Sequence, residues 1–236
     1  MAADVQPVNW WVVVASSAVI GAVVNNAISL WTRHRDSLRE ASATAGRQAY
    51  ARLDVARSLE AFAQRASAYL YAVEAALAAH QAHEDDAFER VDALRVAFEF
   101  EPATIWTDLP IQLVADVREL PVALAASSEW ILAAFENWAD SADAYELSAQ
   151  QAMHFGLLAG ELANQIRRDV GVTPSALVAD HLGHFERAIL DVRQAYLRRS
   201  GELNVLPALE ARFQREPAAP PPPNVSPAPG PTGAAR

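Results

Sequence analysis

The chain opens with a long apolar segment that contains no charged residue. Residues 9–31 are mostly Val, Ala and Ile, and tryptophans mark both ends, Trp10 and Trp11 at one and Trp31 at the other. A helix of this length spans roughly 30 Å, the thickness of the hydrocarbon core of a bilayer. Tryptophan is typical of the two membrane–water interfaces. The pattern therefore predicts one transmembrane helix over residues 9–31.

Two other interpretations of this segment are a cleaved signal peptide and a buried helix of a soluble protein. Residues 1–8 contain no Lys or Arg, and the apolar run is longer than the core of a normal signal peptide. The uncharged length and the tryptophans at both ends disfavour a buried helix. We therefore expect an uncleaved anchor behind a short extracytoplasmic tail, residues 1–8.

Arginines placed after the segment predict its orientation. Arg33, Arg35 and Arg39 follow it, whereas Asp4 is the one charged side chain before it. By the positive-inside rule the N-terminus lies outside and the bulk of the protein is cytoplasmic. All 19 basic residues are arginine, a usage that we attribute to a GC-rich bacterial genome. The expected location is the bacterial inner membrane, where Arg33 and Arg35 meet lipid headgroups.

One face of the predicted span carries small and polar side chains at i, i+4 spacing: Ser17, Gly21, Asn25 and Ser29. Small residues let helices approach closely in a membrane, and an asparagine hydrogen-bonds across such an interface. This pattern favours self-association. The alternative is a single helix whose asparagines lie near the interface and bind water.

Beyond the anchor, the apolar positions follow helical periods and predict an all-α fold. Residues 32–52 read as a basic stalk continuous with the anchor, and residues 53–205 as an elongated antiparallel bundle. Two long patterns form its spine. The first runs to His80 through Ala56, Leu59, Ala63, Ala66, Leu70, Val73 and Leu77. The second is expected as one helix from Pro121 to Gly171, with bulky residues in its first half and Ala and Gly in its second, where a neighbour packs closely.

Shorter helices are expected over Asp85–Phe98, from Asp108 to near Leu120, and from Thr173-Pro174 to near Ser200. Residues 206–236 are expected as a disordered tail rich in Pro and Ala. A plain solvated tail is favoured over a ligand for SH3-like or WW-like grooves, because no basic residue flanks the prolines.

Two histidine pairs with i, i+3 spacing are candidate metal ligands: His80 with His83, and His181 with His184. Neutral imidazoles on two converging helices bind zinc. Against this, His184 falls away from the apolar face of its helix, and a histidine at a helix end also binds the last carbonyls. His154 falls on an outward position. Trp106, Trp130 and Trp138 line a pocket or fill the core.

Composition and missing motifs limit the functions. The net charge of −10 argues against binding nucleic acid, and the absence of cysteine excludes disulfides and thiolate metal sites. No catalytic motif appears, so we expect no enzyme and no cofactor. The leading hypothesis is a membrane-anchored helical interaction or scaffold protein, a homo-oligomer or bound to a protein partner. The alternatives are a tethered sensor with a pocket near Trp106 and Trp138, and a metal-binding protein through the histidine pairs.

Overall fold

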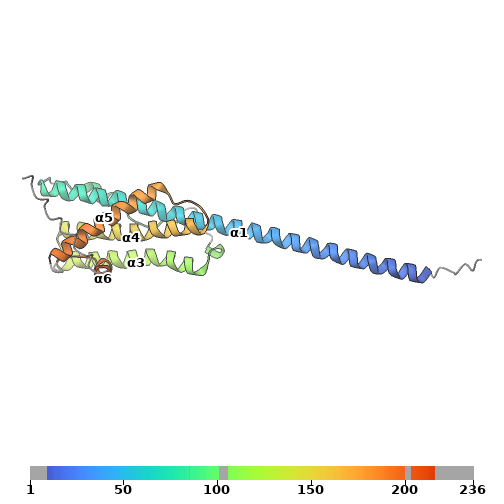
Figure 1. The fold of residues 1–236 in the computed structure, drawn as a ribbon. Coiled ribbons are helices and arrows are strands. Elements are labelled where there is room, and N and C mark those ends of the chain that lie inside the picture. Colours follow the sequence, from blue (N-terminus) through green and yellow to red (C-terminus); the bar gives the residue numbers. More distant parts are fainter. Residues whose placement is uncertain (1–9, 85, 101–105, 200–202, 216–236) are drawn as a thin grey trace, which may run out of the picture.

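The computed structural model describes residues 10–84, 86–100, 106–199 and 203–215. Every regular element in these ranges is a helix, and four of the helices form a bundle from which the start of the first projects (Figure 1). The elements are α1 (Trp10–Gln81), α2 (Glu89–Asp92), the 3-10 helix η1 (Trp106–Asp108), α3 (Ile111–Asn137), α4 (Ser141–Asp169), α5 (Ala176–Arg198) and α6 (Pro207–Arg215). The all-helical bundle is therefore confirmed.

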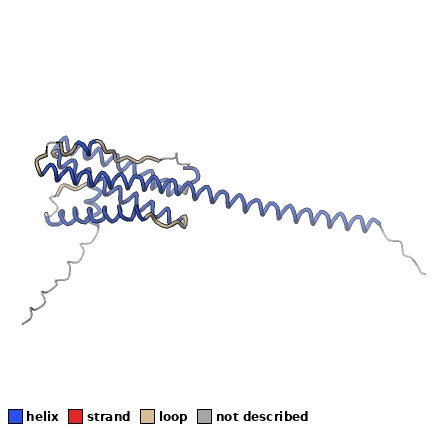
Figure 2. The backbone as a smooth tube through the Cα atoms, turned by 90° about the horizontal axis from the view of Figure 1, so that it is seen from above, coloured by secondary structure: helices blue, strands red, loops and turns tan. Residues whose placement is uncertain are grey.

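Helix α1 joins the N-terminal region to the bundle without a break. It has 72 residues, which corresponds to about 108 Å at 1.5 Å per residue. Among the side chains that the structure describes, none before Ala51 is buried, and the helix there stands clear of the bundle (Figure 2). Residues 32–52, the expected stalk, are helical and continuous with the preceding residues of α1, and the helix enters the core at Ala51.

Within the described part of the chain, no helix is both long and apolar enough to cross a membrane. Residues 10–31 of the predicted span are helical, but most of their side chains are not described. Residue 9 is not described, and neither are the side chains of residues 10–24, 27 and 28.

The core of the bundle lies between α1 and α4, which run antiparallel. Arg167 near the end of α4 pairs with Glu60 of α1, and Gly156 in the middle of α4 faces Ala66 of α1. The predicted apolar positions of α1 are buried as expected except Leu77, which is only partly buried, and small residues of α4 are buried with them. The buried residues are Ala56, Leu59, Ala63, Ala66, Leu70, Val73, Ala152, Ala159 and Ala163. Helix α3 packs on α4, and α5 packs on both α4 and α1.

Gly156 and Gly160 allow α5 to approach α4 closely. A Cβ atom added to Gly156 would lie 2.5 Å from the Phe185 ring and 3.1 Å from the Ala66 Cβ. One added to Gly160 would lie 2.7 Å from Leu182. The expected close packing of a neighbour on this half of α4 is therefore confirmed, and Phe185 fills the space with no exposed surface.

The single helix expected from Pro121 to Gly171 is wrong, because α3 and α4 are separate helices. Helix α3 begins at Ile111, runs through Pro121 and ends at Asn137. The helix predicted to end near Leu120 is therefore the first part of α3. Proline removes one backbone hydrogen bond from a helix interior. Here, Val117 and Leu124 on either side of it are buried, and their packing compensates for the lost bond.

The break between α3 and α4 comes from a capping box at Asp140. The Asp140 carboxylate accepts a hydrogen bond from the Asp143 backbone N–H at 2.8 Å, and the Asp143 carboxylate accepts one from the Asp140 N–H at 3.3 Å. Such reciprocal bonds satisfy two free N–H groups at a helix start. The spacing of apolar residues continues in phase across this turn, which is why periodicity did not reveal it.

The helix expected over Asp85–Phe98 is also mostly absent: only Glu89–Asp92 is helical. Phe98 stacks on Phe62 of α1 with ring centroids 3.7 Å apart, and Arg65 of α1 donates to the Ala97 carbonyl at 2.9 Å. The segment after Asp92 runs back along the bundle, and in it these contacts with α1 take the place of helical hydrogen bonds.

The last two helices differ from expectation at their bounds. Helix α5 begins at Ala176 with Ser175 as its N-cap, two residues after the predicted start, and ends at Arg198. Helix α6 lies inside the segment expected to be a tail from residue 206. Leu206, Leu209 and Phe213 are buried against the bundle, which explains why this part is helical. Residues 216–236 lie outside the described residues.

Replacing Gly156 by alanine should destabilise the bundle by about 1–3 kcal/mol, the usual cost of overpacking. The added methyl would overlap the ring of Phe185, which is fully buried. Urea unfolding of residues 36–215, followed by circular dichroism, measures the change. Gly183→Ala is the matched control, because a Cβ there meets nothing within 4 Å. It should be neutral or stabilising; equal losses in both variants would contradict the close contact.

Candidate ligand-binding groove

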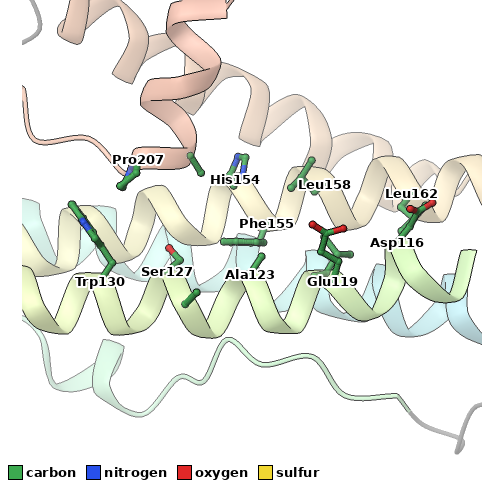
Figure 3. Close-up of a pocket in the computed structure, with 13 residues that line it drawn as sticks. Asp116, Glu119, Ala123, Ser127, Trp130, His154, Phe155, Leu158, Leu162 and Pro207 are labelled. Carbon is green, nitrogen blue, oxygen red and sulfur yellow. The ribbon is translucent and has the colours of Figure 1, made fainter. Parts of the chain in front are cut away.

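A hollow of about 670 Å³ lies between α3 and α4 and is closed at one side by the start of α6 (Figure 3). We call it the α3–α4 groove. Its lining residues are Asp116, Glu119, Leu120, Ala123, Ala126, Ser127 and Trp130 of α3, His154, Phe155, Leu158 and Leu162 of α4, and Pro207 and Ala208 of α6. A largely apolar hollow of this size with few polar groups is typical of small-molecule sites.

The groove exists because small side chains of α3 lie opposite large ones of α4. Ala123 and Ala126 leave space above Phe155 and Leu158. Trp130 stands at one end, beside Pro207, while Glu119 and Asp116 stand toward the other (Figure 3). The groove therefore has an aromatic end and an acidic end.

Gln150 holds the α6 wall in place. Its side chain is buried, its Nε2 donates to the Asn204 carbonyl at 3.0 Å, and its Oε1 accepts from the Leu206 N–H at 2.9 Å. A buried amide that satisfies two backbone groups fixes the segment it binds, since breaking either bond leaves a buried polar group unpaired. The chain entering α6 is thus attached to α4 one turn before His154.

His154 is the titratable group inside the groove. Burial is the main reason that its pKa is lowered to about 4, and the charge of Arg212 on α6 lowers it further. Its Nδ1 is buried and has no hydrogen-bond partner among the described residues. At neutral pH the ring is therefore uncharged. Heptad position placed His154 on an outer face; the structure corrects this, because α6 covers that face of α4.

The acidic end carries two carboxylates at the rim. Asp116 and Glu119 have no hydrogen bond or ion pair with any described residue. A smaller hollow of about 220 Å³ adjoins this end, shares Asp116 and Leu162 with the groove, and also contains Arg52 and Asp169. The buried Nε of Arg52 is likewise without a partner in the described part of the chain.

The tryptophans expected to line a pocket are only partly brought together. Trp130 lines the groove, and Trp138 packs edge-on against it with ring centroids 6.4 Å apart, half exposed. Trp106 lies elsewhere, in contact with Phe100 and beneath the guanidinium of Arg118. The pocket expected near Trp106 and Trp138 therefore corresponds only in part to the groove, which neither of these two residues lines. The sequence pattern predicted neither the interruption of the long helix at Asp140 nor the helix α6, and both shape the groove.

The histidine pairs occupy different parts of the α1 surface. On α5, the Nδ1 of His181 lies 3.1 Å from Ser67 Oγ, and His184 stacks on Tyr71 at 4.1 Å. His80 packs near Phe88, and His83 follows the end of α1 with a left-handed backbone. Among the residues that the structure describes, no three His, Asp or Glu side chains gather as a metal-binding group. His184 also contacts α1, although the sequence placed it away from the apolar face.

The predicted membrane-facing residues are described only in part. Trp31, Arg33 and Arg35 are exposed on α1, with the Arg35 guanidinium 5.6 Å from the centre of the Trp31 ring. Asn25 and Ser29 are exposed as well. The side chains of Trp10, Trp11 and Ser17 and the surroundings of Gly21 are not described. Anchoring and self-association through these positions stay predictions.

The stability of the bundle should fall as the pH is lowered from about 6.5 to about 4 because of His154. In this window the unfolded chain binds a proton on residue 154 that the folded chain does not, since burial lowers the pKa of the folded state to about 4. The loss approaches about 1.4 kcal/mol per pH unit where the difference is complete. His154→Gln should flatten the pH dependence of urea unfolding in this window. His83→Asn, at an exposed site, should leave it unchanged; identical curves for wild type and His154→Gln would contradict the assignment.

Comparisons with known proteins give no match: no family model, no curated protein and no solved structure is similar to this chain. The role of the α3–α4 groove is therefore inferred from its geometry and chemistry.

Proposed function

We propose that the protein is a single-pass membrane protein whose cytoplasmic helical bundle binds a small, mainly apolar ligand in the α3–α4 groove. The observation that carries this is the groove itself, a formed hollow of about 670 Å³ lined by apolar and aromatic side chains with a neutral histidine among them. Ligand sites of this kind have most of their binding energy in apolar burial and use a few polar groups for orientation.

The continuity of α1 supports a tethered role for this site. Residues 9–31 carry the features of an anchor, and the same helix enters the core at Ala51 without interruption. Under the proposed orientation the N-terminus lies outside the inner membrane and the bundle stands in the cytoplasm at the end of the stalk. The groove would then be held at a set distance from the inner leaflet.

Filling the groove should abolish binding of an apolar probe. Ala123 lines the groove, so a phenyl ring in Ala123→Phe would occupy the space above Phe155. Fluorescence titration of residues 36–215 with Nile red, a neutral apolar dye, should show one site per chain in the wild type and at least a tenfold weaker affinity in Ala123→Phe. Ala133→Phe is the control, because it adds the same ring at an exposed position of α3. Equal binding by wild type and Ala123→Phe would reject the groove as a ligand site.

The anchor has its own test. The full chain should sediment with membranes and resist extraction by alkaline carbonate. Ile20→Arg, at the centre of the predicted span, should shift part of the protein to the soluble fraction, since an arginine there costs about 3 kcal/mol of insertion free energy. Ala45→Arg, at an exposed position of the stalk, should stay with the membranes. Recovery of the wild-type chain in the soluble fraction without detergent would refute the anchor.

A second candidate function, an oligomeric scaffold, is favoured by the stalk. The part of α1 before Ala51 has no neighbour in the described structure, and large apolar side chains on it are more than half exposed. These are Leu30, Trp31, Leu38 and Tyr50. A single helix gains little stability from propensity alone, and pairing with a second copy would cover these side chains. Light scattering of the detergent-solubilised full chain tests this, and a strict monomer argues against it.

A further inference from the structure

The α3–α4 groove has a charge pattern that selects among apolar ligands. Its apolar length runs from Trp130 to Leu162, and its charged residues, Asp116 and Glu119, stand at the end away from Trp130 (Figure 3). The lining contains no arginine, and its one histidine is uncharged. The groove therefore presents negative charge at one end only.

The adjoining hollow does not reverse this charge. Arg52 is its one basic residue, and Asp116 and Asp169 line it as well. Together, the two hollows contain three carboxylates against one guanidinium. Electrostatic complementarity of this kind fixes the orientation of a bound molecule.

Building on the proposed function, we propose that the ligand is an amphiphilic cation, an organic ammonium with an apolar chain or ring. Its ammonium group lies between Asp116 and Glu119, and its apolar part lies along Phe155 and Leu158 and reaches Trp130. The two carboxylates have no partner among the described residues, so they are available to the cation. The apolar part supplies most of the affinity, and the carboxylates supply the selectivity.

Dodecyltrimethylammonium and tridecanoate test the proposal as probes that carry the same twelve-carbon chain and opposite charge. The chain is long enough to approach Trp130, which lies roughly 17 Å from Glu119 along α3. The full chain, labelled with 5-fluorotryptophan and held in nanodiscs of zwitterionic lipid, is titrated and followed by 19F NMR. The Trp130 resonance is assigned with Trp130→Phe, and empty nanodiscs correct for partition of the probes into lipid. The ammonium probe should shift the Trp130 resonance and bind about tenfold more tightly than tridecanoate, the selectivity expected of two exposed ion pairs. Butyltrimethylammonium should bind more weakly, because each buried methylene strengthens binding about fourfold.

Variants distinguish the effect of the two carboxylates on binding from the effect of the shape of the groove. Asp116→Asn with Glu119→Gln should bring the affinity for the ammonium probe down to that for tridecanoate. Glu129→Gln with Glu136→Gln, which neutralises two exposed carboxylates of α3 outside the groove, should leave it unchanged. Ala123→Phe should abolish the Trp130 response to either probe.

Each of the other outcomes overturns either the ligand class or the groove as a binding site. If both probes bind with the same affinity, or if the Asp116→Asn, Glu119→Gln variant keeps the preference, the ligand class is wrong while the groove remains a binding site. Tighter binding of tridecanoate, lost in Arg52→Gln, would likewise overturn the cation and place an anion at the adjoining hollow. If neither probe shifts the Trp130 resonance, both this inference and the proposed function fail.

Discussion

The close antiparallel packing of α1 on α4 is the contact on which the rest of the structure depends. Both helices place small residues where they meet, and Ala63, Ala66, Ala159 and Ala163 have almost no exposed surface. This short separation brings α5 near enough for the Phe185 ring to cover Gly156. It also turns the opposite side of α4, with Phe155 and Leu158, toward α3. The wall of the groove on α4 is thus formed by side chains that take no part in the α1–α4 contact.

Periodicity was enough to predict the helices whose apolar faces meet the core, but not where they end. The positions of α1 from Ala56 to Val73 are buried as the heptad pattern indicates, because that pattern and the burial have the same physical cause. The pattern did not predict the break at Asp140, and it did not predict that α3 continues through Pro121. A capping box leaves the phase of the apolar residues unchanged, and tertiary packing outweighs one missing hydrogen bond.

The groove was less accessible to sequence reasoning because three distant segments make it. Trp130 was recognised as a candidate, yet its partners were sought at Trp106 and Trp138. His154 falls on an outward heptad position, and only the folding of Pro207–Arg215 onto α4 encloses it. The apolar residues Leu206, Leu209 and Phe213 at spacings of three and four were the available signal for that helix. They lie just ahead of a proline-rich stretch, which obscured it.

The unbroken course of α1 has a mechanical consequence. Because every residue of an α-helix advances the chain by about 100° and 1.5 Å, the angle between a side chain at position 25 and the core face at Ala66 is set by the number of residues between them. Insertion of one residue in the stalk would swing the mouth of the groove by about 100° around the long axis, whereas seven would restore its direction to within about 20°. A rotation of the N-terminal end of α1 about the helix axis would therefore be transmitted to the bundle, because the helix is continuous.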